Sequence, residues 1–255
     1  MRADQLLVER GLAASRSQAQ RLIASGVQWR QPLHNWQRIE KNGVLLPLDC
    51  ELQLLDDAES RFVSRGGLKL AGALQATGVT VEGLCCLDIG QSTGGFTDCL
   101  LQHGAAQVVG VDVGHAQLHP SLQNDARVVC IEKLNARTLD AADSPLAPHT
   151  PLGGFDLLVA DLSFISLTLV LPVMPALMQD SAHALLLVKP QFELQPADIG
   201  KGGLVKDPAS YAQVQQRLTS ACEQAGFEVL NWLDSPVAGG DGNREFFIHM
   251  RRRMS

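Results

Sequence analysis

The sequence has no C-x-x-C pair and no cluster of cysteines with histidines. Its six cysteines are scattered along 255 residues, and several lie in apolar runs typical of buried strands. Structural zinc sites need closely spaced thiolates and imidazoles, and disulfide scaffolds are short, cysteine-dense secreted chains. We therefore expect reduced cysteines, no metal site and a cytoplasmic protein.

Long hydrophobic runs are also absent. The longest apolar stretch, residues 164–178, contains Pro172 and Pro175 and is shorter than the roughly 20 residues that span a bilayer. The opening MRADQLLVERG places charges among its apolar residues, unlike the hydrophobic region of a secretory signal. We expect neither a secretory signal nor a membrane partner.

Positive charge is scarce overall and unevenly distributed. The net charge is −6, from 21 Lys and Arg against 27 Asp and Glu. Residues 1–50 carry seven basic and four acidic residues, a balance of +3, which leaves 14 against 23, or −9, for residues 51–255. A polyanion such as nucleic acid would therefore meet the N-terminal segment first.

The N-terminal segment has the pattern of two short amphipathic helices. Residues 3–10 and 15–25 have helical spacing of apolar positions, and Ser15 is the expected N-cap of the second helix. Arg16 and Arg21 fall on the exposed side of that helix. They are either contacts for a polyanion or ordinary solvated side chains.

Strands and an acidic linker follow these helices. Residues 27–30 and 44–55 have the composition of strands, and the acidic segment 54–60 has the composition of a linker. We expect a small α+β domain at residues 1–58 and a larger domain at residues 59–255.

Strands and helices alternate through the larger domain. Strands are predicted at residues 85–89, 108–111, 128–131, 157–160, 184–188, 228–233 and 246–250. Helices are predicted at residues 97–102, after Pro172, and at residues 208–225. Such alternation predicts an α/β fold of the Rossmann-like class with a mainly parallel sheet, an antiparallel last strand and a site at the carboxyl ends of the strands.

A glycine-rich turn joins two of the expected elements at residues 88–96, DIGQSTGGF. Glycines let the chain leave a strand sharply and approach a ligand, and Asp112 after the next strand can accept both hydroxyl protons of a ribose. The spacing is G-x-x-x-G-G, and Asp88 before the first glycine would repel the pyrophosphate of a dinucleotide. S-adenosylmethionine, a cationic nucleoside, is the natural candidate ligand. The alternative is a turn that only joins strand to helix.

Four polar residues lie where the expected sheet would place a substrate. Lys69 lies in the helix that opens the larger domain, Asp161 and Lys189 follow strands, and Glu245 opens the last strand. Taken singly, each of these residues could equally belong to an ordinary surface ion pair. Four such residues at these places are much harder to explain by chance.

Two motifs that the sequence lacks narrow the choice of methyl acceptor. Amino-group methyltransferases commonly carry a [DN]-P-P-[YF] loop after the fourth strand, where this chain has ADLSF at residues 160–164. Enzymes that methylate carbon five of pyrimidines need a cysteine nucleophile, and no cysteine follows a strand beside these motifs in the downstream half. A ribose hydroxyl remains. Lys189 could act on it as a base or as an electrostatic stabiliser.

The N-terminal sequence LLVERGLAASRSQAQRLIASG resembles the small RNA-binding domain first named for ribosomal protein S-four. The resemblance implies arginines that contact RNA phosphates. The expected contacts are Arg2, Arg16, Arg21 and Arg65.

The larger domain resembles ribose 2′-O-methyltransferases related to FtsJ, and nearly the whole chain is similar to the TlyA family of rRNA methyltransferases, historically labelled hemolysins. The motifs that carry the resemblance are SRGGLKL, DIGQSTGGFTDCLLQ, VGVDVG, ADLSFIS, VKPQFE and GNREFFIH. The chain departs from the family pattern at Gln91, where a small residue is common, and at His115. The resemblance implies ribosomal RNA or a ribosomal subunit as partner and cytidine as target.

The resemblance also assigns site residues. It implies a catalytic tetrad of Lys69, Asp161, Lys189 and Glu245. S-adenosylmethionine would contact Asp88, Gly90, Ser92, Thr93, Gly94, Gly95, Phe96, Asp112, Val113, Gly114, Glu132, Asn135 and Asp161. Phe164 is either a wall of this pocket or plain core. The competing functions are a membrane-active, hemolysin-like protein and an RNA-binding protein without catalysis.

Overall fold

The computed structural model describes residues 1–13, 15–32, 34–54, 61–239 and 242–254. Contacts divide the chain into two compact units, Met1–Leu68 and Lys69–Ser255. The expected domain boundary between residues 58 and 59 lies outside the described residues, as does most of the expected linker.

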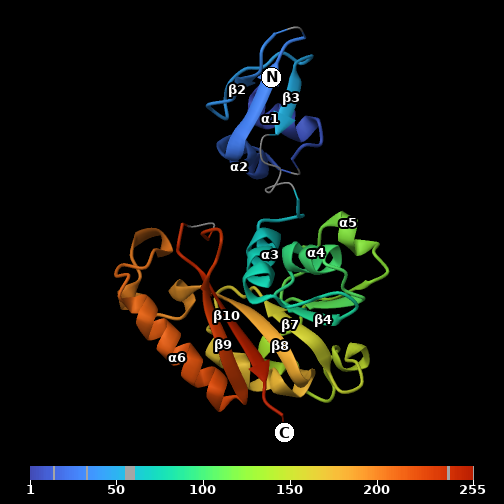
Figure 1. The fold of residues 1–255 in the computed structure, drawn as a ribbon, viewed down its shortest axis with the longest axis vertical. Coiled ribbons are helices and arrows are strands. Elements are labelled where there is room, and N and C mark those ends of the chain that lie inside the picture. The colour runs from blue at the N-terminus through green and yellow to red at the C-terminus, as the bar shows by residue number, and fades with distance from the viewer. Residues whose placement is uncertain (14, 33, 55–60, 240–241, 255) are drawn as a thin grey trace. The chain divides into compact units, whose positions relative to one another are not determined.

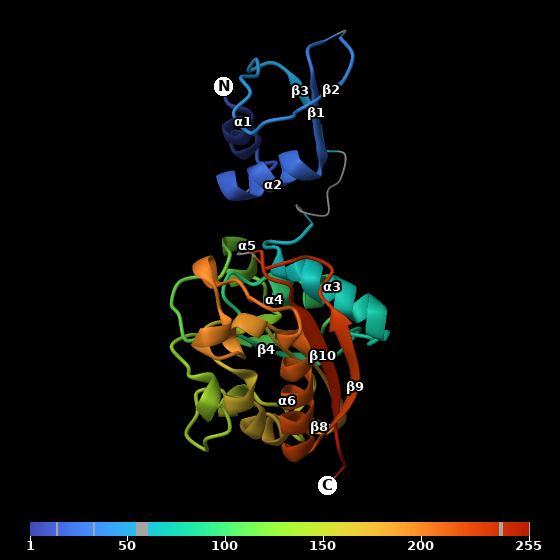
Figure 2. The same ribbon diagram turned by 90° about the vertical axis from the view of Figure 1, so that its left-hand side faces the viewer.

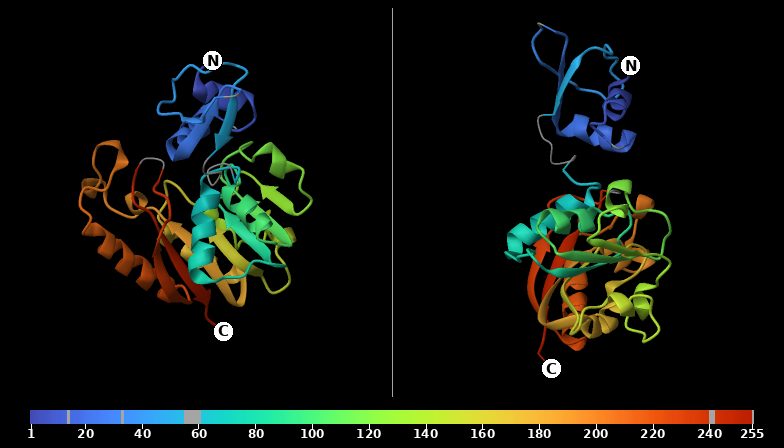
Figure 3. Two further views of the ribbon diagram at one scale, coloured as in Figure 1. Left: turned by 45° about the horizontal axis from the view of Figure 1, so that its top comes forward. Right: turned by 90° about the vertical axis from the view of Figure 1, so that its right-hand side faces the viewer.

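The first unit packs two helices on a small antiparallel sheet. Its helices are α1 (Ala3–Glu9) and α2 (Arg16–Gly26), and its sheet has the order β2-β1-β3, with β1 Val27–Arg30, β2 Gln37–Arg38 and β3 Glu51–Leu54. Figures 2 and 3 show both helices on one side of this sheet. The core between them contains Leu7, Leu22, Ile23, Val27 and Ile39.

Both expected helices form, but the strands of this unit differ from the prediction. The Ser15 side chain caps α2 by accepting a hydrogen bond from the Gln18 amide, as expected. The strand predicted at residues 44–55 is wrong over most of its length, because only Glu51–Leu54 pairs with β1. Pro47 has no amide hydrogen to donate to a ladder. The two-residue strand β2 is too short to carry a sequence pattern.

The second unit is built on a seven-stranded sheet with the order β6-β5-β4-β7-β8-β10-β9. The strands are β4 Cys85–Ile89, β5 Gln107–Val111, β6 Val128–Ile131, β7 Phe155–Ala160, β8 Met178–Val188, β9 Phe227–Asp234 and β10 Phe246–Arg252. The first five are mutually parallel, whereas β10 is antiparallel to both β8 and β9 and lies between them (Figure 1). This sheet confirms the expected fold class.

Helices cover both faces of the sheet. The helices are α3 (Gly66–Thr77), α4 (Gly95–Gln102), α5 (Pro120–Gln123) and α6 (Ser210–Gln224), and α6 runs alongside β9 (Figure 3). Side chains alternate along a strand, and β10 shows the result. Ile248 joins the core beneath Leu218 of α6, whereas Phe247 stacks on Phe96 of α4 with ring centroids 6.1 Å apart.

Between β7 and β8 the structure differs from the prediction. The helix expected after Pro172 is wrong: the segment forms three short 3₁₀ turns at Leu167–Leu169, Leu171–Val173 and Pro175–Leu177. Pro172 is the second residue of one such turn and Pro175 is the first residue of another. Neither has an amide hydrogen to donate to a continuous helix. Strand β8 then starts at residue 178, six residues before the expected 184. The prediction missed this first half because its polar residues interrupt the apolar pattern of a buried strand. In the described part of the chain, no helix combines the length and hydrophobicity needed to span a bilayer.

Candidate active site

A cavity of about 540 Å³ opens at the carboxyl ends of β4, β5 and β7. Its volume is in the range of small-molecule sites. Six of the residues expected to contact a cofactor line it: Gly90, Ser92, Asp112, Val113, Asn135 and Asp161. Gln117 and the segment 162–165 also line it and were not on that expected list.

The glycine-rich turn forms the base of this cavity. Gly90 has φ +86°, and a Cβ there would lie 2.7 Å from the carbonyl oxygen of Asp161. At Gly94, φ is +98° and a Cβ would lie 2.4 Å from a methyl group of Leu122. Both positions therefore require glycine, for backbone conformation and for space.

Asp112 accepts hydrogen bonds from the turn after β4 and from the turn after β5. Its Oδ2 accepts a hydrogen bond from the Ser92 amide at 2.8 Å, and its Oδ1 accepts one from the Gly114 amide at 2.6 Å. A carboxylate has about four lone-pair positions, so two remain for hydroxyl donors of a ligand. The half-buried carboxylate is therefore oriented and still able to bind a ribose.

Asp88 lies beneath the turn and does not line the cavity. Its Oδ2 accepts a hydrogen bond from Thr97 Oγ1 at 2.7 Å, and Thr97 in turn accepts one from Gln91 Nε2 at 2.9 Å. Burial raises the pKa of Asp88 to about 7, against the opposing hydrogen bond from Thr97. Asp88 thus shapes the turn through a buried chain of polar contacts.

Gln91, a departure from the family pattern, has a structural role in this chain. Its side chain is buried directly over Gly110, where a Cβ would lie within 2.0 Å of the amide group. The Gln91 side chain therefore fits in this position only because residue 110 of β5 is a glycine. This pairing joins a residue of the turn after β4 to a residue of β5, and no sequence spacing signals it.

The remaining expected cofactor residues do not line the cavity. Phe96 is buried against Phe247, and Thr93 accepts a backbone hydrogen bond from His119. Glu132 accepts hydrogen bonds from the Ala116 amide and His115 Nδ1, at 2.6 and 2.5 Å. The bond from His115 is the main cause of its lowered pKa. Gly95 and Gly114 also lie outside the lining.

The four expected catalytic residues form two ion pairs. Lys69 Nζ lies 2.5 Å from Glu245 Oε2, and Lys189 Nζ lies 2.6 Å from Asp161 Oδ1. Burial raises the pKa of Glu245, while both Lys69 and Lys189 oppose this and Asp161 adds to it. Each member of the second pair is thus within electrostatic range of Glu245. The fold brings the tetrad together from α3, β7, β8 and β10.

Two further residues lie in this region: Ser163, which was not predicted as a site residue, and Phe164, which was expected to be either a wall of the pocket or core. Ser163 Oγ accepts a hydrogen bond from Lys189 Nζ at 2.8 Å. Phe164 has φ +64°, is 90% exposed and contacts Phe192 in a tilted arrangement, with ring centroids 5.0 Å apart and an interplanar angle of 48°. Of the two readings of Phe164, a core position is wrong, since the ring lines the cavity and faces solvent. The strand-end motif ADLSF was the available signal for both.

In the first unit, two expected RNA contacts converge on one buried carboxylate. Arg2 Nε lies 3.0 Å and Arg16 Nη2 lies 2.9 Å from oxygens of Asp4, and both arginine side chains remain about half exposed. The hydrogen bond from Arg2 is the main cause of the strongly lowered pKa of Asp4. The side chain of Arg21 is outside the described residues, and Arg65 is partly buried. No cluster of three metal-ligating side chains occurs in the described ranges.

The chain is similar to a known family and to several known proteins. The model of the family "FtsJ-like methyltransferase" matches residues 62–252. The chain is 42% identical to the 16S/23S rRNA (cytidine-2′-O)-methyltransferase TlyA of Mycobacterium tuberculosis over 255 residues, covering 98% of this chain and 89% of that protein. It is 37% identical to Hemolysin A of Brachyspira hyodysenteriae, covering 98% and 99%. A solved structure from Streptococcus thermophilus superposes with a TM-score of 0.74 at 38% identity, covering 100% of this chain and 89% of that chain.

Proposed function

The chain belongs to the FtsJ-like methyltransferase family, and from this premise we propose that it methylates the ribose 2′-hydroxyl of a cytidine in ribosomal RNA. The observation that carries the proposal is the meeting of Lys69, Asp161, Lys189 and Glu245 beside a nucleoside-sized cavity. Two alternatives, a membrane-active protein and an RNA-binding protein without catalysis, explain neither the intact tetrad nor the cavity.

S-adenosylmethionine, when bound, supplies a methyl group made electrophilic by the sulfonium. The residues present fit this cofactor, because Asp112 retains lone pairs for ribose hydroxyls and the bare backbone at Gly90 leaves room beside Asp161. Asn135 and Val113 would contact the nucleoside portion. Asp88 would act indirectly, by holding the turn through Thr97.

The second ion pair would activate the acceptor hydroxyl. A ribose hydroxyl is a weak nucleophile, so it must be oriented and its developing negative charge stabilised. Lys189 is oriented by Asp161 and Ser163, and its pairing with a carboxylate supports the role of electrostatic stabiliser over that of base. Lys69 and Glu245 would fix the opposite side of the acceptor.

Phe164 and Phe192 would bind the base of the target nucleotide. Bases stack on exposed aromatic rings with about 1–3 kcal/mol each. Phe164 presents its ring to solvent beside Ser163, which contacts Lys189. A nucleotide stacked there would carry its ribose toward the tetrad.

The first unit would hold the RNA backbone. Arg2 and Arg16 are oriented by the buried Asp4 and are half exposed, so their outward N–H groups could donate to phosphates. Arg21 and Arg65 stay predicted contacts.

The direct test is methyl transfer from labelled S-adenosylmethionine to protein-free rRNA and to isolated ribosomal subunits, followed by nucleoside mass spectrometry. The proposal expects 2′-O-methylcytidine. It expects this product to be lost in Lys189→Ala and retained in Lys201→Ala, which removes an exposed lysine of the same unit. A methyl group on a base, or no transfer to any RNA, would overturn the proposal.

A further inference from the structure

Glu193 is a buried carboxylate that the chemistry above does not use. It lies four residues after Lys189, just beyond the 3₁₀ turn Pro190–Phe192, and its side chain is only 2% exposed. A buried carboxylate is costly unless several donors compensate its charge. The groups that donate hydrogen bonds to Glu193 therefore show which segments of the chain it joins.

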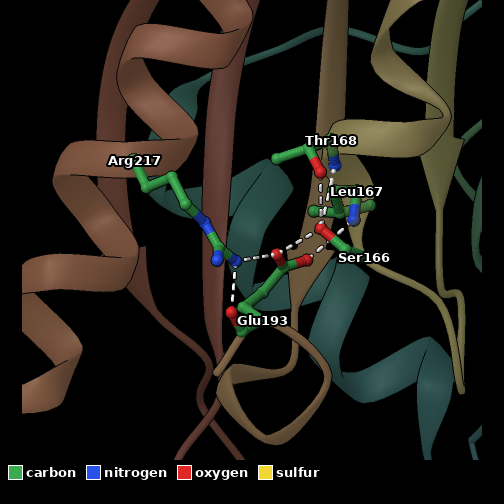
Figure 4. A network of polar contacts seen from close by, with 5 residues as sticks. All are labelled: Ser166, Leu167, Thr168, Glu193 and Arg217. Carbon is green, nitrogen blue, oxygen red and sulfur yellow. Dashed lines mark hydrogen bonds and ion pairs between the residues drawn. The ribbon is translucent and has the colours of Figure 1, made fainter. Parts of the chain in front are cut away.

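Three groups donate to this carboxylate, as Figure 4 shows. Ser166 Oγ donates to Oε2 at 2.6 Å, and the Leu167 amide donates to Oε1 at 2.7 Å. Arg217 Nη2 of α6 donates to Oε2 at 2.6 Å and also to the backbone carbonyl of Glu193. Both oxygens are thus occupied, and a helix of the scaffold supplies the compensating charge.

The contacts join the segment after β7 to the segment after β8. Asp161 and Lys189 begin these segments and are paired with each other, and the tilted Phe164 and Phe192 rings are in contact further along. Glu193 closes the far end by holding Ser166 and Leu167. The stretch between Asp161 and Ser166 is therefore fixed at both ends.

That stretch contains a backbone conformation which needs support. Phe164 has φ +64°, which is unfavourable for a residue with a bulky side chain, and its exposed ring gains little from packing. Leu162 and Ile165 on either side pack against the core, and Glu193 adds hydrogen bonds to Ser166 and Leu167, two and three residues after Phe164.

Resting on the proposed function, we infer that Glu193, held by Arg217, is a positioning residue for methyl transfer. Its carboxylate fixes the conformation of residues 162–166, so that Ser163 meets Lys189 and Phe164 presents its ring to the target base. It touches neither substrate nor cofactor in this role.

Glu193→Gln tests the inference with little change in shape. The glutamine offers one acceptor oxygen, and its NH₂ group would face donors that the carboxylate accepted. We expect amide exchange at residues 162–168, followed by mass spectrometry, to accelerate at least tenfold, while β7 is unchanged. We expect kcat for RNA methylation to fall at least tenfold while the Kd for S-adenosylmethionine changes less than threefold.

Arg217 provides a graded pair of variants. Arg217→Met removes the charge and should reproduce Glu193→Gln, whereas Arg217→Lys keeps a cationic donor and should retain more of the kcat. Two controls separate positioning from general stability. Leu218→Ala weakens the same helix at a buried position, and Glu228→Gln breaks an exposed ion pair with Arg251. Both should keep kcat within twofold below their unfolding temperatures.

The inference is overturned if Glu193→Gln leaves either the exchange rate or kcat within twofold of wild type, or if Leu218→Ala loses as much kcat. If the wild-type protein transfers no methyl group to RNA, the proposed function has failed instead. The exchange measurement, made on the free protein, then decides by itself whether Glu193 holds the segment.

Discussion

Lys189 and Asp161 follow two neighbouring parallel strands and form an ion pair, with 2.6 Å between Nζ and Oδ1. The parallel arrangement brings both strand ends to one edge of the sheet, where Ser163 also accepts a hydrogen bond from the same ammonium group. A charged group held in this way is already oriented before a substrate arrives, which is the condition for electrostatic stabilisation of a transition state.

Replacement of Lys189 by methionine should abolish most methyl transfer without loss of cofactor binding. The substitution keeps side-chain length and removes the charge that would stabilise the acceptor oxygen. We expect kcat to fall by about 10²–10⁴-fold, as for loss of a group that assists proton removal. Calorimetric titration should give a Kd for S-adenosylmethionine within a few-fold of wild type. A variant that binds the cofactor and still turns over normally would exclude Lys189 from the reaction.

The substitution Gly90→Ala should damage the cofactor cavity more than an equivalent change elsewhere. A Cβ at residue 90 would meet the Asp161 carbonyl oxygen at 2.7 Å, in addition to the strain of φ +86°. Gly153→Ala is the matched control, because its φ is +89° and nothing lies within 4 Å of the added Cβ. We expect Gly153→Ala to cost about 1 kcal/mol of unfolding free energy with unchanged Kd. Gly90→Ala should cost more and weaken S-adenosylmethionine binding at least tenfold; equal behaviour of the two would contradict the close approach.

Removal of the Phe164 ring should impair RNA methylation while leaving stability almost unchanged. The ring is 90% exposed, so Phe164→Ala removes little packing. Loss of one stacking contact of about 1–3 kcal/mol predicts a decrease of roughly 5- to 150-fold in kcat/KM for RNA. Phe164→Tyr should retain activity, and Leu152→Ala, at another fully exposed apolar position, serves as the control. A Phe164→Ala enzyme with wild-type kcat/KM would refute stacking.

Asp88 makes the stability of the protein depend on pH. Its pKa is raised from 3.8 to about 7 by burial, so the folded state holds the proton more tightly than the unfolded state. The corresponding stability is fully present below pH 3.8 and is lost as the pH rises through about 7. Because Asp88→Asn cannot ionise, its unfolding free energy relative to wild type should rise by about 4 kcal/mol between pH 4 and pH 7.5.

Urea unfolding at several pH values measures this difference. Asp140→Asn, at an exposed position, is the control. A difference between Asp88→Asn and wild type that stays constant with pH would show that the burial of Asp88 does not perturb its ionisation.

Local patterns in the sequence predicted the places of the proposed catalytic residues. Apolar runs that end in Asp161 and Lys189 predict strands with a polar residue at their carboxyl ends, and parallel strands place such ends at one edge. Likewise, a positive φ at Gly90 depends mainly on the turn itself. These features follow from short stretches of chain, so they can be read without knowledge of the packing.

Prediction failed where packing against distant segments decides the outcome. The full burial of Asp88 and its hydrogen bond from Thr97 were not foreseen, and its expected cofactor contact stays a prediction. The helix expected after Pro172 became separate turns, and the buried position of Glu193 depends on Arg217 from a helix that follows it in the chain.

The sequence by itself determined the α/β fold class and the glycine-rich turn with Asp112, because periodicity and turn chemistry are local properties, and its resemblance to a known family pointed to the proposed tetrad. Only the tertiary structure decided that Lys69 pairs with Glu245 and Lys189 with Asp161, that Phe164 faces solvent, and that Glu193 is buried. Those outcomes depend on which surfaces meet when strands from distant parts of the chain pair, and burial and charge pairing then set the chemistry of each group.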